Sequence, residues 1–388
     1  MNSRTKYIYV TLQSAVFLAL SANLSVAASL HPLESVNGVI WDVSADRILY
    51  EDPSKTLHIL DRNTGANTVI PLAGASSPEY GYLSPSGAIF AASSNSGSVF
   101  SMVYQYQNQT LSVLENHLDS QFSLKVAGNY AIWNAYSNGS LLIERNLSTD
   151  TNLTVASNVG NWVNDVTATG VVDFWSYPGY DVHRYANGVT TSVAHDSSFW
   201  NVYVSTDGIN SVYIKQDPCC ANQKYQLMEA TPSGEIALTP RSSFEPDQGR
   251  NFQIDNGWVA FTEADALGVQ QVWLKSPNGE LSQITHGQNN AQIDSLSSTG
   301  QLTYLLDGKL YVNGDSIGIS GLHPDIVGGI SVGSSHSFWE GNQLLISNGA
   351  TLYSVSTVPE PPAISFFGYG FVLLALLLGK RFGTNMPS

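Results

Sequence analysis

Hydrophobic and polar residues alternate in short runs along the middle of the chain, and a polar turn separates one set of runs from the next. One residue marks each turn, and the eight markers are Asp46, Gly87, Gly128, Gly170, Gly208, Gly257, Gly300 and Gly341. Successive markers lie 41, 41, 42, 38, 49, 43 and 41 residues apart. A period of this length predicts a repeat architecture.

Each repeat carries the pattern of four short strands. In the second repeat, residues 80–83 precede the turn, and residues 88–94, 99–106 and 111–116 follow it. These runs alternate with period two and are rich in β-branched and aromatic residues, which predicts strands. Glycine and asparagine in the turns allow the positive φ angles of tight hairpins. Outside the two termini, no stretch predicts a helix of useful length.

Four strands in about 40 residues are typical of a β-propeller blade. The segments LSPSGAIFAA, VSTDGINSVYI and LSSTGQLTYL resemble the hairpins of TolB-like and WD-repeat-like propellers. The resemblance implies an all-β propeller of eight, or seven to eight, four-stranded blades over residues 29–357. The alternatives are a seven-bladed ring with one degenerate repeat and a non-propeller array of sandwiches.

The eighth repeat ends after its third strand, which leaves the ring one strand short. An open sheet edge would template aggregation. Residues 29–35 precede the first repeat and belong to none, so we expect them to supply the missing outer strand.

The C-terminal segment combines three features in a fixed order. Val358-Pro359-Glu360-Pro361 comes first, the uncharged residues 363–379 follow, and Lys380 and Arg381 come next. At ~1.5 Å per residue the uncharged stretch is about 25 Å of helix, near the lower limit for spanning a bilayer. This arrangement resembles a PEP-CTERM sorting signal at residues 358–388. The resemblance implies a transient transmembrane helix, cleavage by an exosortase-type enzyme, and release to the cell surface or the extracellular matrix. The alternative is a permanent C-terminal anchor.

Residues 1–28 have the organisation of a bacterial signal peptide. Arg4 and Lys6 give a positive start, residues 16–24 are mostly apolar, and residues 25–28 are small. The alternative is an uncleaved N-terminal anchor. Both termini therefore predict export.

The chain is acidic, with a formal net charge of −15. Without the two terminal signals, 12 basic and 30 acidic residues remain, a net charge of −18. Such a surface repels nucleic acid, so we expect no nucleic-acid partner. The candidate partners are the processing enzyme, exopolysaccharide and envelope proteins. No motif points to a cofactor.

The longest repeat contains both cysteines, Cys219 and Cys220, in an insertion. Adjacent Cα atoms lie ~3.8 Å apart, below the ~4.4–6.8 Å of an ordinary disulfide, so a vicinal bridge would be strained. We expect such a bridge in an oxidising compartment; buried thiols and an intermolecular bond are the alternatives.

Candidate chemistry is scattered along the strands. His183 and His195 lie near Asp181 and Asp196, but a metal site needs three or four converging ligands, and strand or surface histidines are the simpler interpretation. Five carboxylates have positions from which they could face a central channel, where propeller glycosidases use acid pairs: Asp165, Asp173, Asp255, Glu263 and Asp265. No two of them can be paired from sequence.

Six tryptophans recur near strand positions: Trp162, Trp175, Trp200, Trp258, Trp273 and Trp339. They predict packing between blades or, alternatively, a sugar-stacking platform at the ring mouth.

Three functions fit these patterns. We expect an exported binding or structural module, with no enzyme activity, no catalytic residue and no metal site. The alternatives are a carbohydrate-active hydrolase or lyase with an axial carboxylate site, and a TolB-like periplasmic protein-interaction module. Fold alone does not choose among them.

Overall fold

The computed structural model describes most of the chain between the two predicted terminal signals. It describes residues 26–72, 75–94, 101–117, 124–136, 140–159, 164–218, 223–243, 252–320, 326–327, 330–331, 335–340, 343–348 and 350–359. The chain divides into two compact units, and Leu30–Val355 is the one that contains nearly all the described strands. The other unit comprises Met1–Ser29 and Ser356–Ser388.

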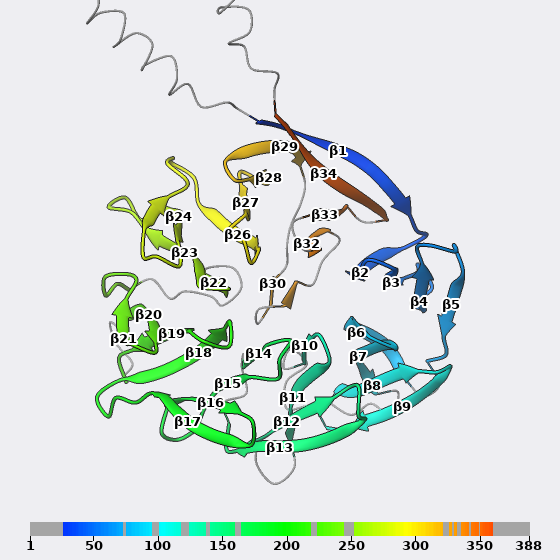
Figure 1. The fold of residues 1–388 in the computed structure, drawn as a ribbon, viewed down its shortest axis with the longest axis horizontal. Helices are drawn as coiled ribbons and strands as arrows, with labels where there is room; N and C mark the ends of the chain where they lie inside the picture. Colours follow the sequence, from blue (N-terminus) through cyan, green and yellow to red (C-terminus); the bar gives the residue numbers. More distant parts are fainter. Residues whose placement is uncertain are drawn as a thin grey trace, which may run out of the picture. The chain divides into compact units, whose positions relative to one another are not determined.

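Leu30–Val355 folds as an eight-bladed β-propeller, and every blade is a four-stranded antiparallel sheet (Figure 1). Blades 1 to 4 are β2 (Val39–Val43), β3 (Arg47–Glu51), β4 (Leu57–Asp61) and β5 (Asn67–Ile70); β6 (Ala75–Ser84), β7 (Gly87–Ser94), β8 (Ser101–Gln107) and β9 (Thr110–Glu115); β10 (Lys125–Ala127), β11 (Tyr130–Tyr136), β12 (Ser140–Asn146) and β13 (Thr151–Ser157); and β14 (Asp165–Val166), β15 (Val172–Trp175), β16 (Val182–Ala186) and β17 (Val189–Ala194).

Blades 5 to 8 continue the ring. They are β18 (Trp200–Thr206), β19 (Ser211–Gln216), β20 (Tyr225–Thr231) and β21 (Gly234–Ala237); β22 (Phe252–Asp255), β23 (Trp258–Ala264), β24 (Gln270–Lys275) and β25 (Leu281–Gln283); β26 (Ala291–Leu296), β27 (Leu302–Leu306), β28 (Lys309–Val312) and β29 (Asp315–Ser320); and β32 (Ser335–Glu340), β33 (Gln343–Asn348), β34 (Thr351–Pro359) and β1 (Val26–Ser35).

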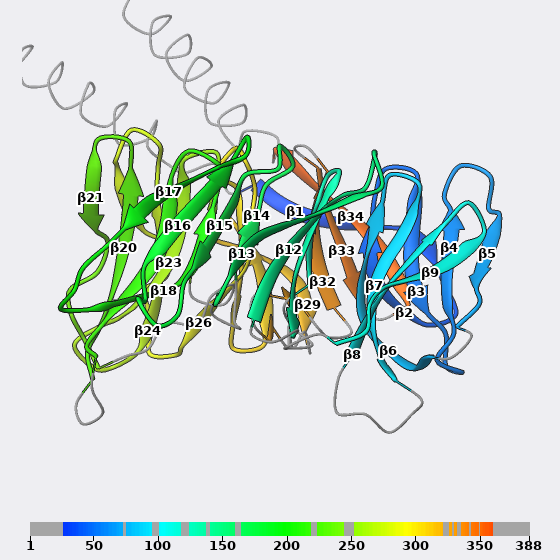
Figure 2. The ribbon, with the colours of Figure 1, turned by 90° about the horizontal axis from the view of Figure 1, so that it is seen from below.

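Burial decreases from the second strand of a blade to the fourth. The burial patterns of β3, β19 and β27 are almost continuous, whereas β21 is exposed throughout and β5 along most of its length. In Figure 1 the first strands lie nearest the middle of the ring and the fourth strands lie at the rim. Figure 2 shows the blades edge-on, with neighbouring blades face to face. Inner strands are covered by both neighbouring blades, so they carry the β-branched and aromatic runs.

The hydrophobic core lies between blades. One cluster joins Val272 of blade 6 to Ile293 and Tyr304 of blade 7, and another joins Ile89 of blade 2 to Trp133 of blade 3. Stability in such a ring is approximately a sum of contributions from individual repeats and from their interfaces.

Two of the turn glycines pack directly against the preceding blade. Gly300 has φ +79°, and a Cβ built on it would lie 2.4 Å from the indole ring of Trp258. Gly170 has φ +78°, and its Cβ would lie 2.7 Å from the ring of Tyr130. Both aromatic residues begin the second strand of the preceding blade. Glycine is therefore required at these two turns for its positive φ and for its lack of a side chain.

The predicted closing strand is confirmed. β1 is the outer strand of blade 8 and lies next to β34. The amide of Val36 donates to the carbonyl of Ala350 at 2.8 Å, and Glu34 forms an ion pair with Arg62 of blade 1 at 3.4 Å. A core cluster also joins Ile48 of blade 1 to Leu345 and Leu352 of blade 8. The ends of the ring are thus held together by backbone pairing, charge and packing.

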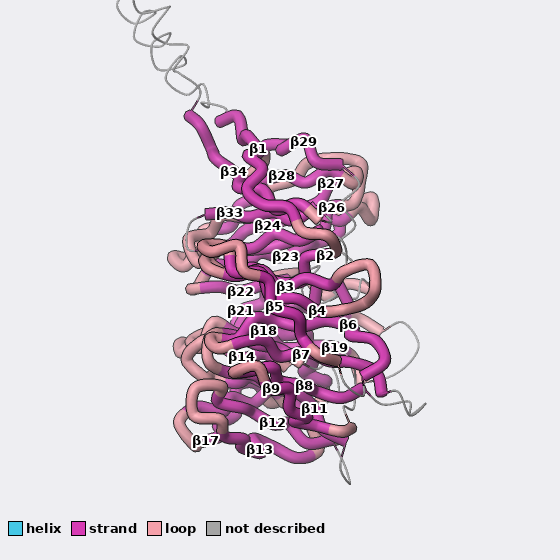
Figure 3. The backbone as a smooth tube through the Cα atoms, turned by 90° about the vertical axis from the view of Figure 1, so that its right-hand side faces the viewer, coloured by secondary structure: helices cyan, strands magenta, loops and turns pink. Residues whose placement is uncertain are grey.

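One element was not expected from the sequence. A two-stranded hairpin of β30 (Ile326–Val327) and β31 (Ile330–Ser331) follows β29, the fourth strand of blade 7. In the view of Figure 1 this hairpin lies inside the ring. Figure 3 shows that the described backbone consists of strands and their connecting loops.

The terminal predictions fall mainly outside the described residues. The signal peptide up to residue 25, Glu360, Pro361, the expected helix 363–379, Lys380 and Arg381 all lie there, while Val358 and Pro359 are the last residues of β34. Along the part of the chain that the structure does describe, no helix has the length and hydrophobicity to cross a membrane. The sorting signal therefore stays a prediction.

Candidate functional site

The carboxylates of Asp42 and Asp165 join the first strands of neighbouring blades. Asp42 accepts the amide of Leu83 in blade 2 at 2.7 Å, and Asp165 accepts the amide of Thr206 in blade 5 at 2.9 Å. Each also accepts the amide of the residue that follows it. The two positions are equivalent in their blades, so we interpret these contacts as a repeated inter-blade clamp.

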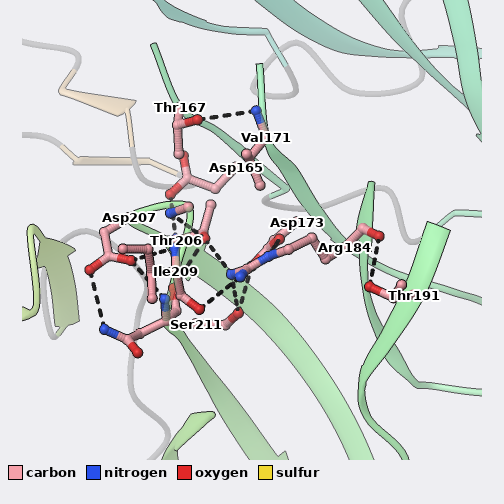
Figure 4. A network of polar contacts seen from close by, with 12 residues as sticks. Asp165, Thr167, Val171, Asp173, Arg184, Thr191, Thr206, Asp207, Ile209 and Ser211 are labelled. Carbon is pink, nitrogen blue, oxygen red and sulfur yellow. Dashed lines mark hydrogen bonds and ion pairs between the residues drawn. The ribbon is translucent and has the colours of Figure 1, made fainter. Parts of the chain in front are cut away.

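Asp165 and Asp173 are the two candidate carboxylates that the fold brings together, because they lie directly opposite each other in β14 and β15. Asp173 is fully buried. Its carboxylate accepts hydrogen bonds from Nε and Nη2 of Arg184, at 2.8 and 2.9 Å, and from the hydroxyl of Ser211 at 2.6 Å (Figure 4). Lys125 lies 3.4 Å from Asp165. Burial acts to lower the pKa of Arg184, but the hydrogen bond to Asp173 and the charge of Asp173 raise it above its ordinary value.

These contacts leave the pair charge-balanced. Both oxygens of Asp165 and both oxygens of Asp173 accept hydrogen bonds from donors in blade 4 or blade 5. Four acceptor atoms engaged with a guanidinium, hydroxyls and amides are typical of a structural network. A glycosidase pair would instead need one carboxyl group able to donate a proton to substrate.

The other three candidate carboxylates do not converge. Asp255 lies opposite Trp258, the first residue of β23. Glu263 lies five residues farther along β23, which at ~3.3 Å per residue places it about 16 Å from Trp258. Burial raises the pKa of both. Glu263 lines a small pocket with Tyr225 and Ser242. Asp265 caps a turn by accepting the amides of Leu267 and Val269.

Two perturbed acids were missed by sequence reasoning. Burial raises the pKa of Asp42 to about 6, although the amides of Leu83 and Val43 act to lower it. Burial also raises the pKa of Asp294, in β26, to about 6, although a hydrogen bond from Thr303 acts to lower it. Their position on the innermost strand of a blade is the signal that would have found them.

The histidine cluster forms pairs. His195 contacts Asp181 at 2.9 Å, and His183 contacts the hydroxyl of Ser176 at 3.1 Å. Burial lowers the pKa of His183. Asp196 pairs with Lys215 at 2.6 Å. Over the residues with described positions, no group of three or more His, Cys, Asp or Glu side chains could hold a metal ion.

The candidate tryptophans that the structure describes lie at interfaces between blades. Trp258 and Trp273 pack against the cores between blades, and the indole of Trp339 donates to Ser295 at 2.9 Å. Packing is therefore confirmed for these residues. Trp162, like Cys219 and Cys220, lies outside the described residues.

Trp175 and Trp200 pack against the same core as Trp273. They also belong to an aromatic stack, defined as Trp175, Tyr177, Tyr180, Trp200 and Tyr203. The ring of Tyr180 stacks on Trp200 with 4.3 Å between centroids and on Trp175 with 6.0 Å. Tyr177 meets Tyr180 edge to face at 5.4 Å and is 56% exposed. Tyr203 contacts Trp175 at 6.1 Å. The stack thus runs from the inter-blade core to solvent.

Chain direction places the stack on one face of the ring. β15 ends at Trp175, and the loop of residues 176–181 connects it to β16. β18 begins at Trp200, directly after the connection from blade 4 to blade 5. In an antiparallel blade, these two connections lie at the same end of the strands. The polar turns around Gly170 and Gly208 lie at the other end.

The loop that carries Tyr177 is held by backbone hydrogen bonds. Ser176 donates to Asp181 at 2.9 Å, Tyr177 donates to Asn158 at 2.7 Å, and Asn201 donates to Tyr180 at 2.8 Å. The Tyr177–Pro178 peptide is cis. The exposed ring is therefore presented by a loop tied to blades 3, 4 and 5.

No protein-family model and no curated protein matches the chain. Among solved structures, BamB from Moraxella catarrhalis is similar at 11% identity and TM-score 0.50, covering 84% of this chain and 97% of that chain. TolB from Acinetobacter baumannii is similar at 16% identity and TM-score 0.36, covering 72% and 69%. The C-terminal WD40 domain of Sif2 is similar at 13% identity and TM-score 0.48, covering 85% and 98%. At 11% identity the similarity to BamB shows the fold alone, and that fold is the β-propeller that the repeat predicts.

Proposed function

We propose that this chain is an exported β-propeller that acts as a non-catalytic binding module of the bacterial envelope or extracellular matrix. The observation that carries the proposal is the contrast between two sets of side chains. The carboxylates that the fold brings together, Asp165 and Asp173, accept hydrogen bonds from Thr206 and Ser211 and so hold blades 4 and 5 together. The aromatic stack, in contrast, reaches solvent on a face of the ring.

Export is the part of the proposal that rests on sequence. The signal peptide at residues 1–28 and the PEP-CTERM resemblance at residues 358–388 support it. An exosortase-type enzyme would be the first partner, and the membrane would hold the chain only until cleavage. Exopolysaccharide or envelope proteins would be the partners of the mature ring.

Processing of the termini tests this proposal. Mass spectrometry of the protein recovered from envelope and matrix fractions should show that the residues after about Pro362 are missing. A Glu360→Ala variant should stay uncut and membrane-bound. Recovery of matrix protein that still ends at Ser388 would contradict sorting by this signal.

A carbohydrate-active enzyme is the second candidate. The raised pKa values of Asp42 and Asp294, both about 6, favour it because a general acid must be protonated near its working pH. Release of reducing ends from a polysaccharide, lost in both Asp42→Asn and Asp294→Asn, would support this function. Retention of the polysaccharide without cleavage would support the binding module.

A further inference from the structure

The aromatic stack has a polar rim that makes it a candidate binding site in its own right. Asp181 and His195 form a pair in which the His195 side chain is 67% exposed. Ser176 and His183 form a second pair in the same loop region. Carboxylate, imidazole and hydroxyl groups together offer both donors and acceptors near the exposed ring of Tyr177.

Two cations on this face have acid partners. Lys215 pairs with Asp196 at 2.6 Å, and Arg241 pairs with Asp217. The cations of Lys215 and Arg241 also lie over the ring of Phe199, at 4.8 and 4.4 Å from its centroid. Lys215 and Arg241 therefore each have an acid partner on this face.

We propose that the aromatic stack, with Tyr177 at its exposed end, binds a neutral polysaccharide. A pyranose ring presents a face of polarised C–H groups and a rim of hydroxyls. The negative face of an aromatic ring attracts the C–H groups. Ser176 and Asp181 lie in the same loop as Tyr177, and with their partners His183 and His195 they supply groups for the hydroxyls. The acidic balance of the chain, −15 overall, disfavours anionic polymers.

Preorganisation supports the same conclusion. Three backbone hydrogen bonds tie the 176–181 loop and Tyr180 to their surroundings, so a ligand would not have to order the loop. The inference deepens the proposed function and rests on it only in requiring that the ring reach the outside of the cell. A binding assay on purified protein does not depend on export. A failure to bind sugar is therefore distinguishable from a failure of the proposed export.

The test uses the full-length purified chain and four neutral hexasaccharides: cellohexaose, chitohexaose, xylohexaose and mannohexaose. Isothermal titration should give saturable binding of at least one of them at millimolar concentration or below. Saturation-transfer NMR should label the C–H protons on one face of the sugar rings. An alginate hexasaccharide serves as the anionic comparison and should bind more weakly.

Two substitutions at Tyr177 and one matched control complete the design. Tyr177→Ala removes an exposed ring and should weaken binding about tenfold or more, whereas Tyr177→Phe keeps the ring and should bind nearly as well as the original chain. Ile209→Ala removes a 65% exposed apolar side chain from the opposite end of the strands and should change nothing. Absence of saturable binding by all four neutral sugars, equal affinity of Tyr177→Ala, or stronger binding of alginate would each overturn the proposal. The NMR labelling of the unaltered chain keeps the test decisive if a variant fails to fold.

Discussion

Replacement of Gly300 by alanine should destabilise the interface between blades 6 and 7 through two separable effects. The new Cβ would lie 2.4 to 2.6 Å from three ring atoms of Trp258, and the backbone has φ +79°. Gly268 has the same φ of +79°, but a Cβ there meets nothing within 4 Å. Gly268→Ala is therefore a matched control that contains the backbone effect without the contact.

The two effects have different expected sizes. A left-handed backbone costs an alanine about 1–2 kcal/mol. Overpacking against a ring that has limited room to move adds about 1–3 kcal/mol. We expect Gly268→Ala to lose about 1–2 kcal/mol of unfolding free energy and Gly300→Ala about 2–5 kcal/mol.

The assay is urea unfolding of the full-length chain, followed by far-ultraviolet circular dichroism. A double-mutant cycle with Trp258→Ala isolates the contact. Without the indole ring, Gly300→Ala should cost only as much as Gly268→Ala does in the original chain. Equal losses for Gly268→Ala and Gly300→Ala in the presence of Trp258 would refute the reasoning, since the ring would then contribute nothing.

Three further predictions concern the other interfaces. Arg184→Leu should cost about 3–5 kcal/mol in urea unfolding because it leaves the buried Asp173 carboxylate without its cation, and adding Asp173→Asn should recover part of the loss; no recovery would contradict the charge argument. Burial raises the pKa of Asp294 from 3.8 to about 6 in the folded chain, so its contribution to stability should fall as the pH rises from about 4 to about 6. Asp294→Asn should remove that loss, so its stability relative to the original chain should increase by about 1–3 kcal/mol over this range, measured by unfolding at each pH; a pH-independent difference would count against it. Deletion of residues 29–35 should lower the melting midpoint and promote self-association, seen by light scattering, because it uncovers the edge of β34. Unchanged melting would mean that the ring closes in another way.

The repeat pattern was sufficient to predict the ring because each blade uses the same local chemistry. Turn glycines such as Gly170 and Gly300 recur at a nearly constant spacing, and the surplus strand before the first repeat could only complete the last one. The β30–β31 hairpin was missed because its strands are two residues each, too short to show a period.

The candidate site was less predictable for a physical reason. A repeat shows which residues occupy equivalent strands but not which side chains cross from one blade to the next. Asp165 and Asp173 were both candidates, yet only the register of β14 with β15 places them opposite each other, and only the fold supplies Arg184. Trp175 and Trp200 pack against the core as the sequence predicts, but only the fold shows that Tyr180 stacks on both of them.

Incubation of the full-length chain with matrix polysaccharide from the producing cells tests the central claim most directly. Retention on the polysaccharide and release of new reducing ends should be measured in the same sample. The account predicts retention without new reducing ends, because the paired carboxylates Asp165 and Asp173 hold blades together. New reducing ends that disappear in Asp42→Asn and Asp294→Asn would contradict it and establish the ring as an enzyme.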